Sequence, residues 1–69
     1  MAEITRSHEI MMNLLENCGL TEEMAAVETL MLGPKENMLK MADWLEERNF
    51  KVTEGEIARA VSEIRRGII

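Results

Sequence analysis

The strongest constraint on the fold is a set of residues that end and start helices and so divide the chain into segments. Gly19 can take the left-handed conformation that commonly ends a helix, and Thr21 is a good N-cap for the next one. Gly33-Pro34 stops that helix, because proline lacks an amide hydrogen and disfavours helix in the preceding residue. Proline is nevertheless well suited to the first turn of a new helix.

A further junction follows at Asn49, which can take the left-handed conformation, and Thr53 and Glu56 have the spacing of a capping box. Gly67 is placed to close the last helix. No stretch alternates apolar and polar residues over a useful length, which disfavours strands. We predict an all-α single domain over residues 1–69, a compact bundle of four short helices spanning about 3–17, 22–31, 34–48 and 54–66.

Apolar residues at three- and four-residue spacing predict the buried face of each helix. For the first two helices the predicted inward residues are Ile4, Met11, Leu15, Cys18, Met24, Val27, Leu30 and Met31. For the last two they are Met38, Met41, Ala42, Leu45, Ile57, Val61 and Ile64. Phe50 and Val52 are expected to return to the core after the third helix.

Methionine is unusually abundant: the 69 residues include seven methionines but one tryptophan, one phenylalanine and no tyrosine. Methionine is unbranched and polarizable, so it packs adaptably in a core or at a binding surface. The simplest interpretation assigns four of them to the core, namely Met24, Met31, Met38 and Met41. Met11 and Met12 then remain as candidates for an adaptable surface.

Catalytic and metal-binding patterns are weak. His8 is the single histidine, and its sequence neighbour Ser7 does not face it on a helix. Cys18 is ten residues further on, about 15 Å along the same helix. One histidine and one cysteine cannot form a structural zinc site within a monomer, and no glycine-rich phosphate loop is present. We therefore expect a protein that is not an enzyme and has no metal or cofactor.

The net charge of −5 arises in the first half of the chain. Residues 1–33 carry Arg6 as their one base together with the acids Glu3, Glu9, Glu16, Glu22, Glu23 and Glu28. An acidic chain is poorly suited to bind nucleic acid, which requires Lys and Arg to neutralise phosphates. Two interpretations stay open: solubilising helix faces, or an acidic inhibitor or nucleic-acid mimic that binds a basic partner.

Two stretches resemble known modules. Residues 52–60 (Val-Thr-Glu-Gly-Glu-Ile-Ala-Arg-Ala) resemble the first helix of a helix-turn-helix, but only five residues follow Ile64, too few for a recognition helix. A degenerate DNA-binding module is therefore the least favoured alternative. Residues 14–45 are similar in outline to the ubiquitin-associated three-helix domain, which implies an apolar patch at Cys18-Gly19-Leu20 and Trp44-Leu45.

Apolar residues are in excess of what so small a core can bury, and contiguous exposed apolar residues mark interaction sites. The favoured function is a protein–protein interaction module that uses an apolar, Met-rich helix face. The candidate partner-binding residues are Ile10, Met11, Met12, Leu14 and Trp44. The partner is expected to be another protein or a second copy in a homodimer. Without a signal-peptide pattern or a membrane-spanning stretch, a cytoplasmic location is expected.

Overall fold

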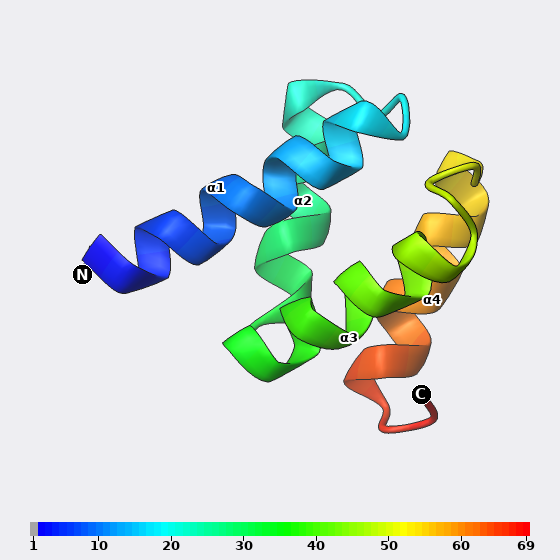
Figure 1. Ribbon diagram of the computed structural model, residues 1–69. Coiled ribbons are helices and arrows are strands. Elements are labelled where there is room, and N and C mark those ends of the chain that lie inside the picture. The colour runs from blue at the N-terminus through cyan, green and yellow to red at the C-terminus, as the bar shows by residue number, and fades with distance from the viewer. Residues whose placement is uncertain (1) are drawn as a thin grey trace.

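The computed structural model describes the backbone of residues 2–69 and the side chains of residues 6–69. Its four helices are α1 (Ala2–Asn17), α2 (Glu22–Leu32), α3 (Lys35–Glu47) and α4 (Glu54–Arg65), and the described backbone contains no strand (Figure 1). The all-α prediction is confirmed, and every predicted helix end lies within one residue of the observed end. The side chains of Glu3 and Ile4 lie outside the described residues. A radius of gyration of 10.8 Å matches the value of about 11 Å expected for a compact chain of this length.

Three helices end in the same way. The N–H groups of Leu20, Phe50 and Ile68 donate to carbonyls five residues earlier, at 3.3, 2.9 and 2.9 Å, which is the long bond of a Schellman motif. The residue before each donor has a positive φ, and these residues are Gly19, Asn49 and Gly67. The three helix-ending signals are therefore confirmed. Phe50 also has a positive φ of 59°, an uncommon conformation for an aromatic residue that the sequence did not indicate.

Side-chain caps start two of the helices. The Thr21 hydroxyl accepts a hydrogen bond from the Met24 N–H at 3.2 Å. At α4 the capping box is complete: the Glu56 N–H donates to the Thr53 hydroxyl at 3.1 Å, and the Thr53 N–H donates to the Glu56 carboxylate at 2.8 Å. Pro34 is the N-cap of α3 rather than its first residue, so this helix begins one residue later than predicted.

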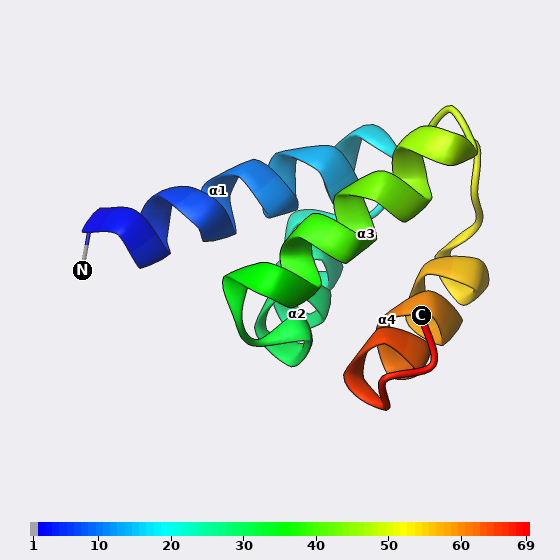
Figure 2. The ribbon, with the colours of Figure 1, turned by 60° about the horizontal axis from the view of Figure 1, so that its bottom comes forward.

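The four helices pack compactly, and α2 and α3 each contact all of the other helices. α1 packs most extensively on α2 and also contacts α3, while α4 packs on both α2 and α3. Over the part of the chain that is described, α1 and α4 do not touch. α1 and α3 lie side by side and run in similar directions, and the start of α1 projects beyond the other helices (Figures 1 and 2).

The core draws on all four helices and on the α1–α2 connection. Its buried apolar residues are Met11, Leu15, Leu20, Ala25, Leu32, Met38, Met41, Leu45, Ile57, Ala60, Val61 and Ile64. The predicted inward residues of α3 and α4 are therefore buried, with Ala42 partly so. Phe50 and Val52 pack against this core as half-buried residues, as predicted.

The predicted inward face of α2 is wrong. Val27, Leu30 and Met31 are exposed, Leu30 to 69%, and Met24 is only half-buried. The buried residues of this helix are Ala25, Glu28, Thr29 and Leu32. α2 is apolar on several sides, so its sequence does not indicate which side turns inward. The small side chains of Ala25 and Thr29 let α2 approach its neighbours, and the Thr29 hydroxyl is satisfied by donating to the Ala25 carbonyl at 2.7 Å.

Candidate functional site

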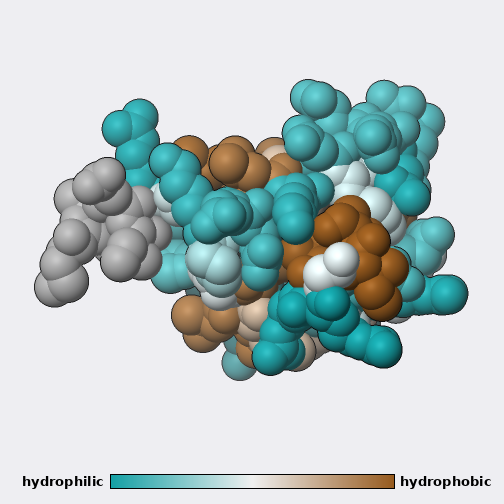
Figure 3. Space-filling view, turned by 90° about the horizontal axis from the view of Figure 1, so that it is seen from below, coloured by the Kyte–Doolittle hydropathy of each residue, from teal (hydrophilic) through white to brown (hydrophobic). Residues whose placement is uncertain are grey.

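Exposed apolar side chains occur at three places on the described surface. The first is a groove between α1 and α3, where Ile10 and Leu39 are exposed. The second is the outer side of α2, with Val27, Leu30 and Met31, and the third is the C-terminal end, with Ile68 and Ile69. The view from below shows hydrophobic areas separated by hydrophilic side chains (Figure 3). Apolar surface of this kind is a feature of interaction sites.

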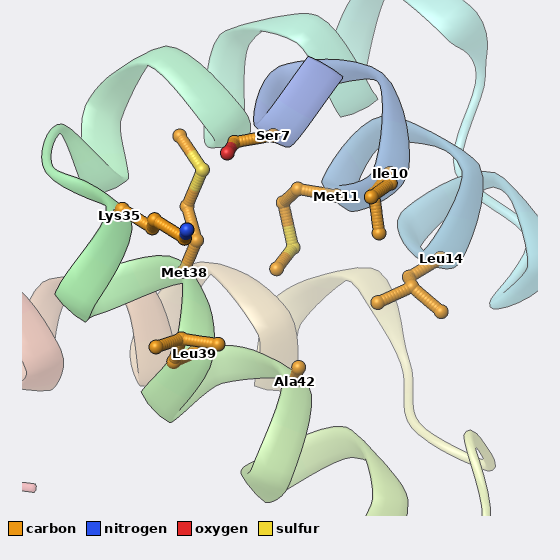
Figure 4. A pocket seen from close by; sticks show the side chains of 8 residues that line it. All are labelled: Ser7, Ile10, Met11, Leu14, Lys35, Met38, Leu39 and Ala42. Carbon is orange, nitrogen blue, oxygen red and sulfur yellow. The ribbon is translucent and has the colours of Figure 1, made fainter. Parts of the chain in front are cut away.

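A groove lies between α1 and α3 (Figure 4). Its lining residues are Ser7, Ile10, Met11 and Leu14 from α1 and Lys35, Met38, Leu39 and Ala42 from α3. Its volume is about 120 Å³, whereas pockets for drug-sized ligands and cofactors measure about 300–1,000 Å³. A cavity of about 150 Å³ holds one benzene molecule, so the groove has room for about one apolar side chain.

The two walls of the groove have the same spacing. Each helix contributes residues i, i+3, i+4 and i+7, beginning at Ser7 on α1 and at Lys35 on α3. Met11 and Met38 point into the space between the helices and form its floor, being only 2% and 5% exposed (Figure 4). Ile10 and Leu39 form its rim and are 54% and 58% exposed. The groove is therefore a fixed apolar floor with two accessible apolar edges.

Polar groups gather at one end of the groove. Ser7 and Lys35 are the first lining residues of their helices, and the remaining six lining residues are apolar. Because α1 and α3 run in similar directions, these two residues lie at the same end (Figure 4). The groove thus has a direction, with a cation at its start and Leu14 and Ala42 at its far end.

The structure brings together three of the five candidate residues. Ile10, Met11 and Leu14 line the groove. Met11 was predicted both as an inward residue and as a candidate for an adaptable surface; it is buried in the core, as the inward prediction had it, and forms the floor of the groove. Met12 is half-buried against the core and is not among the lining residues. Sequence reasoning expected a contribution from the Met-rich face of the third helix but named none of the α3 wall residues Met38, Leu39 and Ala42 as contact candidates, although the repeated spacing on the two helices could have indicated them.

Trp44, the fifth candidate, lies outside the groove lining and packs against the core. The Arg48 guanidinium lies over its ring, 4.2 Å from the ring centre, and donates to the Trp44 carbonyl at 3.1 Å. This cation–π contact covers one side of the ring and helps to satisfy the last turn of α3. The ring therefore has an intrachain role as a partly buried anchor.

Two ionisable groups are perturbed by burial. Burial raises the pKa of the half-buried Cys18 thiol, which disfavours the reactive thiolate. Glu28 is buried on α2, and burial raises the pKa of its carboxyl group, with a further increase caused by the charge of Glu54. Glu28 is consequently removed from the exposed acidic set that an acidic mimic would use. Glu9, Glu16, Glu22 and Glu23 remain exposed.

Other types of site find little support among residues whose side chains are placed. His8 is half-buried on α1, and no group of three or more His, Cys, Asp or Glu side chains is arranged to hold a metal ion. No helix within the described range is both long and apolar enough to cross a membrane.

The patch implied by the ubiquitin-associated outline is largely lost, because its two leucines, Leu20 and Leu45, are buried and Cys18 and Trp44 are only partly exposed. Their burial leaves the groove as the better candidate for a contact surface. Comparisons with protein-family models, with curated proteins and with solved structures give no match to this chain.

Proposed function

We propose that this protein acts by protein–protein contact and that the α1–α3 groove receives the apolar face of a helix. The observation that carries the proposal is the pair of matched walls, each presenting residues at i, i+3, i+4 and i+7. A helix that docks into a hydrophobic groove presents its apolar anchors at this same spacing, so it can follow walls built in this way. A helix laid between α1 and α3 would place its apolar side chains over Met11 and Met38.

The energetics support a side-chain occupant. Complete burial of an Ile or Leu side chain contributes about 1.5–3 kcal/mol. Ile10 and Leu39 are each about half exposed, so covering them contributes roughly 1 kcal/mol apiece. The floor is already buried and ordered, which limits the entropy lost on binding.

A displayed library of helical peptides provides the test. The immobilised protein is used to select binders, at a density low enough to keep copies of the chain apart. Selected peptides are expected to carry apolar residues at helical spacing and to bind Leu39→Gln about fivefold more weakly, because its rim becomes polar. Glutamine is a good helix former, so the substitution preserves α3.

Leu30→Gln is the matched control, since it changes another exposed leucine, on α2. Peptides selected on the wild-type chain should bind this variant unchanged. Selection of no peptide would contradict the proposal, as would peptides that bind Leu39→Gln as well as the wild type. If the selected peptides bound Leu39→Gln normally but no longer bound Leu30→Gln, the contact surface would lie on α2, and the proposal would also be overturned.

A further inference from the structure

We propose that the occupant of the groove is a second copy of this chain, related to the first by a two-fold axis that passes between the α3 helices of the two copies, perpendicular to both. This inference rests on the proposed function, because it uses the same groove as a contact surface. It is carried by the charges and sizes of four residues along one row of α3, namely Lys35, Leu39, Ala42 and Glu46.

The row is continuous along the helix. Lys35, Leu39 and Ala42 line the groove, and Glu46 extends the same row one turn further because it lies four residues beyond Ala42. Lys35 and Glu46 are both exposed. At a rise of 1.5 Å per residue they are about 16 Å apart, too far to pair within one chain. The row therefore presents a cation at one end and an anion at the other.

An antiparallel second copy supplies an opposite charge to both Lys35 and Glu46. With the two-fold axis between Leu39 and Ala42, Lys35 of each chain faces Glu46 of the other, and the ion pair occurs twice. A parallel arrangement would instead place lysine against lysine and glutamate against glutamate.

The apolar residues agree with the same axis. It places Leu39 of one chain opposite Ala42 of the other, so that a large side chain meets a small one on both sides. Ile10 and Leu14 of α1 flank this contact, because they line the same groove. Pairing would thus cover the exposed rim in a chain whose single small core gains from association.

Sedimentation equilibrium at up to about 1 mM protein tests the dimer, since this range detects even weak pairs. The wild-type chain is expected to dimerise. Leu39→Gln should weaken the dimer roughly thirtyfold, because two-fold symmetry removes the apolar contact twice. Leu30→Gln, on the exposed side of α2, should leave the dimer unchanged.

Charge exchange tests the geometry. Lys35→Glu and Glu46→Lys should each weaken the homodimer about tenfold, because two modest surface pairs become repulsive. Both changes favour the dipole of α3, so neither should unfold the monomer. An equal mixture of the two variants should recover the dimer as a heterodimer. One chain then carries an acid at both ends of the row and the other a base at both ends, so both ion pairs form again.

The outcomes separate the two proposals. If the wild-type chain stayed monomeric but bound the selected peptides, only the proposal that a second copy occupies the groove would be overturned. A monomer that also binds no peptide would overturn the proposed function as well. A dimer that survives Leu39→Gln, or a mixture that recovers no heterodimer, would overturn the antiparallel arrangement.

Discussion

α2 and α3 are consecutive helices of similar length, yet they differ in how the sequence relates to the buried face. In α3 the predicted row of Met38, Met41 and Leu45 is buried. In α2 three of the four predicted inward residues are exposed, and the buried residues include Glu28 and Thr29. The difference reflects the distribution of charge along the two helices.

α3 carries charged residues on its outer side, and burying any of them would cost free energy. These residues are Lys35, Glu36, Lys40, Asp43, Glu46 and Glu47, all of them exposed. The only charged residues of α2 are Glu22, Glu23 and Glu28, two of which lie in its first turn. The rest of α2 can turn almost any side inward, so close approach at Ala25 and Thr29 decides its rotation. A row of charged residues thus fixes the rotation of a helix, because those residues must stay in contact with water.

The largest expected effect is on the free energy of unfolding, when a buried leucine of α3 is replaced and compared with an exposed leucine of α2. Leu45→Ala leaves a cavity in the core and should lower the free energy of unfolding by about 2–5 kcal/mol. Leu30→Ala should change it by less than about 0.5 kcal/mol. Urea denaturation followed by circular dichroism measures both. Equal losses would show that α2 is rotated differently.

A smaller effect is expected at the start of α2. Thr21→Ala removes the hydroxyl that accepts from the Met24 N–H and should cost about 1 kcal/mol. The same denaturation measurement applies, with Thr21→Ser as the control because serine keeps the cap. α3 begins without a side-chain cap and so has no equivalent of this bond. A variant as stable as the wild type would mean that packing alone fixes where α2 begins.

The smallest effect is expected from Glu28→Gln, which preserves shape and removes the charge. Burial raises the pKa of Glu28 above its ordinary value near 4.5. The native state therefore binds this proton more tightly than the unfolded chain does, and the ionised carboxylate destabilises the fold at neutral pH. The substitution should raise the free energy of unfolding at neutral pH.

The gain should shrink as the pH falls through the pKa of the folded state and vanish below that of the unfolded chain. Denaturation at a series of pH values measures this trend. Glu54→Gln should give part of the same gain, because the Glu54 charge contributes to the shift. A Glu28→Gln variant that is less stable at neutral pH would indicate a favourable contact of the carboxylate instead.

Helix number and boundaries could be predicted because their causes are local. Gly19, Thr21, Pro34 and Thr53 act within a few residues of themselves, and the structure places a helix end at each. The rotation of α2 could not be predicted, since it depends on the shapes of neighbouring helices. The groove was predicted in part: its α1 wall follows from the apolar excess near Ile10, whereas its α3 wall depends on the packing of two helices far apart in sequence.

The absence of contact between α1 and α4 across the described part of the chain bears on how the protein folds. Each pair of touching helices is separated by at most one other helix, so only short loops close during folding. Helical proteins with such local contacts fold in roughly microseconds to milliseconds. Both walls of the groove also precede α4 in the chain, so bringing α1 and α3 together requires only the closure of the segment that contains α2.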